Sequence, residues 1–316
     1  MTSIDRSYLH PEARRVIEGF EAGGKKYYYT YDSVEEARSV YEQRSKFASG
    51  NYDFDGTSEE MFVPSSDVPT GLPITVNKPS NCDGDPVILI FFHGGGFTLG
   101  SRASRQVMCQ MIATQGKCIV VNAEYRIGPE HRTPAWLNDG VTVAKWVKDN
   151  KLKIGGGLNS KIGVSGDSAG GTIASCLVFE VPDIDFQILI YPRIGYEMTS
   201  GSFKAYSENH LLTMKQMLWF KDMYVNEDDS KDPRFNLMLR EDLSKVPATL
   251  FIVAECDPLR EDSYAFAEKL DKAGVKNEVF LLKGVMHSFV HSVVLYPENC
   301  EKTYNKIIEF MSQYKN

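Results

Sequence analysis

One serine of this 316-residue chain stands in a pattern that suits nucleophilic chemistry. The segment Gly166-Asp167-Ser168-Ala169-Gly170 fits the G-x-S-x-G pattern, and it lies between a strand-like run, 161–165, and a helix-like run, 169–180. Such a serine is lifted out of a sheet by a sharp strand-to-helix turn, and flanking glycines permit the close backbone approach that the turn requires. Ser168 is therefore a candidate nucleophile.

A glycine run upstream could stabilise the charge that such chemistry develops. The segment His93-Gly94-Gly95-Gly96-Phe97 directly follows the apolar run 87–92. Backbone N–H groups on a glycine loop can bind the negative oxygen of a tetrahedral intermediate, and the amide of Ala169, in the first turn of a helix, is a further free donor. The sequence thus predicts an oxyanion hole built from Gly94, Gly95, Gly96 and Ala169.

A serine nucleophile needs a base, and three histidines follow Ser168 in the chain: His210, His287 and His291. His287 follows the strand-like run 278–282 by a short loop and is the predicted base. His291, one helical turn further on, is the competing candidate, which we expect instead to cap an element or to face solvent. Because a base must be neutral to accept a proton, we expect activity to fall at acidic pH.

A carboxylate must hold the base in the right tautomer, and Asp257 is the predicted one. It comes shortly after the strand-like run 249–254, so its side chain can reach a histidine at the same edge of a sheet. Glu261 and Asp262 are the alternatives. Both suit the first turn of the next helix, where acidic side chains favour the helix dipole.

Strand-like and helix-like runs alternate along most of the chain. This order predicts a mostly parallel central sheet with helices on both faces. The strand-like runs are 74–78, 87–92, 118–123, 161–165, 187–191, 249–254 and 278–282.

Two stretches interrupt this alternation and are predicted to form a helical cap. Residues 1–55 precede the core, and residues 194–236 form an insertion, which leaves 56–193 and 237–316 as the core. Ligand pockets in open α/β sheets lie at the carboxyl ends of the strands, which the cap could cover. The alternative is two unrelated surface helices. Candidate pocket walls are Phe97, Asp167, Phe203, Leu212 and Met214.

Four further features have structural explanations that we favour over functional ones. The tyrosine-rich tract 27–31 suits packing between cap and core, although a surface near the substrate entrance is the alternative. His93, Arg126 and Glu130 are expected to hold loops together rather than to contact substrate.

Composition excludes several classes of partner. The net charge of −7 argues against nucleic acid or an anionic membrane as the main partner. No apolar stretch approaches the ~18 residues that span a bilayer, and we expect no targeting segment. The six cysteines show no C-x-x-C spacing, which favours reduced thiols in a cytoplasmic protein, and no metal site is evident.

Taken together, the motifs resemble the hormone-sensitive-lipase-like carboxylesterases, which include the arylacetamide-deacetylase-like enzymes. They occur in the family's order: His93-Gly94-Gly95-Gly96, Tyr125-Arg126 with Pro129-Glu130, Gly166-Asp167-Ser168-Ala169-Gly170, Asp257-Pro258-Leu259 and His287-Ser288-Phe289. The resemblance implies an α/β-hydrolase fold with a helical cap, and Ser168, His287 and Asp257 as nucleophile, base and orienting acid. One departure is Ser288, where the family usually has glycine.

The expected activity is hydrolysis of short- to medium-chain carboxylic esters through an acyl-enzyme on Ser168, without cofactor or metal. An amidase or deacetylase, a lactonase, or a dehydratase could use the same residues. A non-catalytic receptor of the same fold is a further alternative, which the presence of all three candidate residues disfavours. The substrate is expected to be a small-molecule ester. The sequence leaves the oligomeric state open, a homodimer included.

Overall fold

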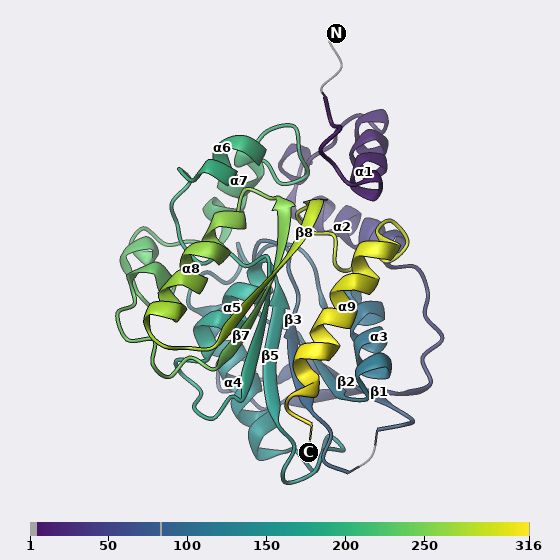
Figure 1. Ribbon diagram of the computed structural model, residues 1–316, viewed down its shortest axis with the longest axis vertical. Helices are drawn as coiled ribbons and strands as arrows, with labels where there is room; N and C mark the ends of the chain where they lie inside the picture. The colour runs from purple at the N-terminus through teal and green to yellow at the C-terminus, as the bar shows by residue number, and fades with distance from the viewer. Residues whose placement is uncertain (1–4, 83, 316) are drawn as a thin grey trace.

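A β-sheet runs through the centre of the molecule (Figure 1). In the computed structural model, which describes residues 5–82 and 84–315, its strands are β1 (Gly56–Val63), β2 (Leu72–Pro79), β3 (Ile88–Phe92), β4 (Ile119–Ala123), β5 (Ile162–Asp167), β6 (Phe186–Ile190), β7 (Ala248–Cys256) and β8 (Asn277–Met286). They lie in the order β1-β2-β4-β3-β5-β6-β7-β8. The β1–β2 and β2–β4 pairs are antiparallel, and the others are parallel. The predicted mostly parallel sheet is confirmed.

Two details of the sheet differ from the prediction. β1 was not expected, because most of its side chains are exposed and it lacks an apolar pattern. β8 continues to Met286, where it pairs with Cys256 beyond an irregularity in β7. His287 therefore follows the strand directly, without the predicted connecting loop.

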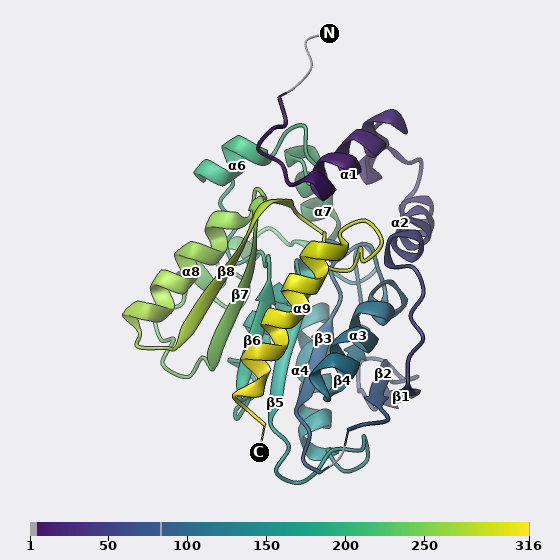
Figure 2. The ribbon, with the colours of Figure 1, turned by 45° about the vertical axis from the view of Figure 1, so that its right-hand side comes forward.

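Helices cover both faces of the sheet, and the side chains of the buried strands alternate between them. In β3, Ile88 and Ile90 belong to one core, whereas Leu89 and Phe91 belong to the other. The first core includes side chains of α4 (Ala135–Asp149), α5 (Ala169–Leu177) and α8 (Arg260–Lys272). The second includes side chains of α3 (Gln106–Gly116) and α9 (Pro297–Ser312), which lie side by side in Figure 2.

The remaining α-helices lie at the end of the sheet where the parallel strands end (Figure 1). We call them the cap: α1 (Pro11–Ala22), α2 (Val34–Ser49), α6 (Gly201–Tyr206) and α7 (Met214–Tyr224). Short 3-10 turns complete the described part: η1 (Tyr28–Thr30), η2 (Arg102–Arg105), η3 (Asp229–Lys231) and η4 (Leu237–Leu239). Both stretches that were expected to be helical thus contain helices above the strand ends.

Two features of the described structure concern the burial of its cysteines and the character of its helices. All six cysteines are buried, and burial raises the pKa of Cys118, Cys176 and Cys300 to about 12. Across residues 5–82 and 84–315, no helix has the length and apolar character needed to cross a bilayer.

Candidate active site

Ser168 occupies the turn between β5 and α5 in a strained conformation. Its φ of 54° and ψ of −116° lie in a region that a residue with a side chain rarely adopts. The neighbouring glycines make the turn possible. A Cβ on Gly166 would lie 2.3 Å from the carbonyl carbon of Gly170, and one on Gly170 would lie 1.9 Å from the carbonyl oxygen of Phe92. The close backbone approach inferred from the sequence is therefore present.

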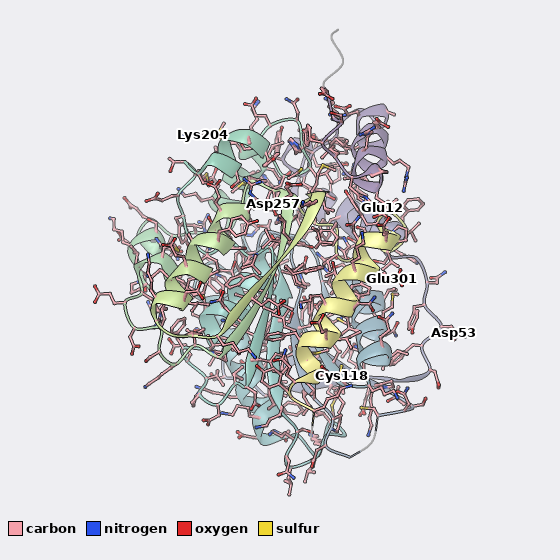
Figure 3. All side chains as sticks on the ribbon, in the orientation of Figure 1. Glu12, Asp53, Cys118, Lys204, Asp257 and Glu301 are labelled. Atoms are coloured by element: carbon pink, nitrogen blue, oxygen red, sulfur yellow. The ribbon has the colours of Figure 1, made fainter. Side chains whose placement is uncertain are left out.

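The three residues of the predicted triad come together at the strand ends. His287 Nε2 lies 2.9 Å from Ser168 Oγ, and His287 Nδ1 lies 2.6 Å from Asp257 Oδ2. The other oxygen of Asp257 accepts a hydrogen bond from the Leu259 amide at 2.9 Å. Figure 3 shows Asp257 at the end of the sheet nearest the cap. This geometry fits an imidazole that carries its proton on Nδ1 and receives the serine proton on Nε2.

Asp262 and Glu261, the alternatives to Asp257, bind backbone amides and not His287. Asp262 Oδ2 accepts from the amides of Ile194 and Gly195, and the Glu261 carboxylate accepts from those of Gly201 and Ser202. Both carboxylates therefore hold the start of the cap insertion against α8.

His291 does not face solvent, which corrects the expectation from the sequence. Its side chain is 6% exposed and its Nδ1 has no partner. Burial, together with the nearby charge of Arg105, lowers the pKa of His291 to about 3. The ring is therefore neutral at physiological pH. The Tyr8 hydroxyl contacts His210 Nε2 at 3.0 Å, so His210 is likewise engaged away from Ser168.

The glycine loop after β3 offers two free amides rather than three. The Gly94 N–H donates to Asp167 Oδ1 at 2.8 Å, so it points away from Ser168 and Gly94 is no oxyanion donor. In the described structure, the amides of Gly95, Gly96 and Ala169 have no acceptor. Gly95 and Gly96 have φ values of 132° and 61°, which glycine adopts readily.

The buried ion pair of Asp167 and Arg105 fixes this loop through the Gly94 amide. Asp167 accepts two hydrogen bonds from Arg105, both 2.9 Å long, and Arg105 also donates to the Tyr41 hydroxyl at 2.9 Å. Burial alone would raise the pKa of Asp167, but Arg105 outweighs it and keeps that pKa below its ordinary value. Asp167 is thus an anionic anchor for Gly94 and not a pocket wall, since its side chain is fully buried.

Helix α2 also contacts this loop, through the side chain of Arg38. Arg38 donates from Nε to the carbonyl of Thr98 at 2.9 Å and forms a bidentate pair with Glu130 at 2.8 and 2.7 Å. Two further contacts agree with the structural roles predicted for this region. Arg126 pairs with Asp139, and His93 Nε2 lies 2.9 Å from Glu124 Oε1.

A cavity of about 690 Å³ lies between the triad and the cap. Ser168 and His287 lie on its wall, as do residues of α1, α2 and α7. Of the predicted wall residues, Phe97 and Leu212 line it. Phe203 and Met214 do not, because Phe203 is buried on α6 and Met214 is exposed at the start of α7.

The tyrosine-rich tract serves both purposes that were considered for it. Tyr27 and Tyr28 line the cavity, and Tyr28 also packs on the ring of Tyr41 at 5.4 Å between centroids. Ser288, the departure from the family pattern, has a φ of 66° and also lines the cavity. This backbone conformation favours glycine, which explains the family's usual residue.

Several residues of the site gave no signal in the sequence. Tyr41 and Phe220 are distant in the chain from the loop after β3, and Arg105 acts on it through Asp167, 62 positions further on. No spacing motif links these residues to the loop. A Cβ on Gly96 would lie 2.4 Å from the Phe220 ring, so α7 packs directly on this loop.

Comparisons with known proteins agree with this fold. The family described as alpha/beta hydrolase fold matches residues 89–291. An ethyl acetate hydrolase of Pseudomonas putida is 27% identical over 97% of this chain and 99% of its own. Esterase LipI of Mycobacterium tuberculosis is 33% identical over 69% of this chain and 70% of its own. A solved esterase of Pyrobaculum calidifontis has a TM-score of 0.84 at 30% identity, covering 95% of this chain and 97% of its own. The chain therefore belongs to the α/β-hydrolase-fold family, among the hormone-sensitive-lipase-like esterases.

Proposed function

We propose that this protein is a serine carboxylesterase that hydrolyses short- to medium-chain esters through an acyl-enzyme on Ser168. The observation that carries the proposal is the hydrogen-bonded chain from Ser168 Oγ to His287 and on to Asp257, which opens on the cavity beneath the cap. The named esterases among the relatives support the same reaction class.

The reaction follows from the roles of these side chains. His287 Nε2 takes the hydroxyl proton as Ser168 Oγ attacks the ester carbonyl carbon. The amides of Gly95, Gly96 and Ala169 bind the oxyanion, and protonated His287 then gives its proton to the leaving alcohol. A water molecule, activated by the same base, attacks the acyl-enzyme and releases the acid.

The cavity supports a substrate of modest size. Its volume is about 690 Å³, and much of its wall is apolar or aromatic, with Phe20, Leu212, Met217 and Phe220 among the lining residues. An acyl chain of a few carbons gains apolar burial there. A series of 4-nitrophenyl esters from acetate to decanoate would measure the preferred length, with the highest kcat/KM expected at short to medium chains.

Replacing the nucleophile tests the mechanism. We expect Ser168→Ala to fold normally and to lose 4-nitrophenyl butyrate hydrolysis by a factor on the order of 10⁴ or more, since the attacking oxygen is removed. Circular dichroism would serve as the folding control. In the unaltered protein, mass spectrometry after treatment with an organophosphate should place the adduct on Ser168. Near-normal turnover by Ser168→Ala would contradict the mechanism.

A further inference from the structure

Arg193 carries a charge that no acidic side chain in the described ranges contacts directly. Its side chain follows β6 and lines the same cavity as Ser168. Nη1 donates to the carbonyl of Gly195 at 3.0 Å, but Nε and Nη2 are buried and have no hydrogen-bond partner. Within residues 5–82 and 84–315, no carboxylate oxygen lies within 4.0 Å of this guanidinium. A buried cation without a counter-charge is costly, and it requires an explanation.

Two aromatic rings hold the guanidinium in place without neutralising it. Its central carbon lies 4.1 Å from the ring centroid of Tyr196 and 5.8 Å from that of Tyr224. Stacking of this kind orients the flat group and contributes modestly to its stability. These rings do not cancel the positive charge, which lies on the cavity wall.

Asp262 lines the same cavity, but its carboxylate binds backbone amides and not Arg193. Asp262 Oδ2 accepts hydrogen bonds from the amides of Ile194 and Gly195. Burial raises the pKa of Asp262 above its ordinary value, although these amides and Arg193 oppose the rise. Asp262 therefore compensates Arg193 only from a distance.

Other cationic side chains also line the cavity. Arg15, Arg44 and Lys221 form no salt bridge with any residue in the described ranges, and apart from Asp262 the acidic side chain on the wall is Glu197. The whole chain has a net charge of −7, so this concentration of cations is local to the cavity. An excess of positive side chains on a cavity wall attracts anionic ligands.

Arg193 is also close to the reacting groups along the chain. The Ser168 amide donates to the carbonyl of Ile190 at 2.8 Å, and the ring of Tyr191 packs on His287 with centroids 4.6 Å apart. The Thr172 hydroxyl, one turn into α5, donates to the carbonyl of Arg193 at 2.7 Å. The backbone of Arg193 thus lies beside the elements that carry Ser168 and His287, and its side chain lines the same cavity.

We propose that the site prefers esters that carry a carboxylate on their acyl or alcohol part, and that Arg193 binds this carboxylate. The inference rests on the proposed esterase function and names a substrate class for it. A carboxylate bound in the cavity supplies the direct counter-charge that the guanidinium lacks.

Two matched pairs of esters test the preference. Monoethyl glutarate is compared with ethyl 5-methylhexanoate, in which an isopropyl group replaces the carboxylate of the acyl part. The acetate ester of 4-hydroxybenzoate is compared with 4-isopropylphenyl acetate, which makes the same change on the alcohol part. We expect kcat/KM to favour the charged ester by about tenfold or more in at least one pair.

Variants assign the preference to Arg193. Arg193→Met removes the charge but keeps an unbranched chain, and the ratio of the two kcat/KM values should fall about tenfold. Arg193→Lys keeps a charge without the flat stacking group and should retain part of the preference. The matched control is Lys204→Met, on the outer side of the cap in Figure 3, which removes an exposed cation that does not line the cavity and should leave the ratio unchanged.

Binding without turnover gives a second measurement. Calorimetry with Ser168→Ala should detect glutarate, and adding Arg193→Met should weaken its binding about tenfold. Equal kcat/KM values within both ester pairs would overturn the proposal while leaving esterase activity intact. A preference that survives Arg193→Met would overturn the assignment to Arg193. Failure of the unaltered protein to hydrolyse any of the four esters would instead contradict the proposed function.

Discussion

At the scale of single residues, the site separates two histidines that lie four positions apart. His287 is bonded to Asp257 and Ser168, so each of its ring nitrogens has a partner. His291 is buried beside them without a partner for Nδ1, and its surroundings include Arg105, Asp167 and His287. The two environments differ because the Nδ1 of His287 has the carboxylate of Asp257 as a hydrogen-bond partner, whereas the Nδ1 of His291 has none. His291 is therefore neutral in the folded protein at physiological pH.

This burial predicts a pH-dependent stability. The pKa of His291 in the folded protein is about 3, below the ordinary value of about 6.5. The unfolded chain therefore binds a proton between these values that the folded chain does not, and stability is lost as pH falls through this window. From pH 7 to pH 5 the loss from this one group is about 2 kcal/mol. Urea denaturation at both pH values measures it.

The variant His291→Gln should reduce the difference in unfolding free energy between pH 7 and pH 5 by that amount, whatever its effect at pH 7 alone. His131→Gln, which changes an exposed histidine in the same way, is the matched control and should keep the difference. An unchanged difference in His291→Gln would show that other groups cause the acid sensitivity.

At the scale of elements, helix α2 of the cap supports the loop that carries Gly95 and Gly96. Arg38 on this helix binds the carbonyl of Thr98, and Tyr41 binds Arg105, which in turn holds Asp167. Asp167 then fixes the Gly94 amide. The loop that presents Gly95 and Gly96 is therefore held from two sides.

Tyr41→Phe should lower kcat with little change in KM. The variant leaves the ring but removes the acceptor for Arg105, and a buried hydrogen bond of this kind contributes about 1 kcal/mol, or roughly fivefold in rate. The oxyanion forms only in the transition state, so binding of the ground state should be spared. Steady-state kinetics with 4-nitrophenyl butyrate measure both constants.

The matched control is Tyr31→Phe, which removes a hydroxyl that accepts from Arg44 on the same helix but does not connect to Asp167. It should leave kcat unchanged. A rise in KM at constant kcat in Tyr41→Phe would indicate a role in substrate binding instead.

The sequence predicted the buried strands and the close approach of Ser168, His287 and Asp257 because both depend on local patterns. Apolar runs mark strands such as β3 and β4, and the triad residues follow strands in a fixed order. β1 has no such pattern because it is an exposed edge strand. Arg105 and Asp167 are 62 positions apart, and no local pattern links them. Their pairing could not be predicted from the sequence because it depends on how the fold brings η2 next to β5.

At the scale of the whole molecule, the beginning of the described chain is fastened to its last helix. Glu12, on α1, lies beside the first turn of α9 (Figure 3). Its carboxylate accepts from the amides of Glu298 and Asn299 at 2.9 and 3.3 Å and from the Asn299 side chain at 2.6 Å. Glu12, from the first helix, thus caps the N-terminus of α9, the last helix of the described chain. Since α1 also lines the cavity, this contact supports the cap above Ser168.

Glu12→Ala should therefore destabilise the protein by about 2 kcal/mol, because the first amides of α9 lose their acceptor and the helix dipole loses a nearby anion. Glu12 is 4% exposed, so water does not readily replace the carboxylate. The midpoint of urea denaturation measures the change. Glu18→Ala, an exposed position of α1, is the matched control and should have little effect. If both variants shifted the midpoint equally, the loss would reflect α1 itself and not the contact that joins the two ends of the fold.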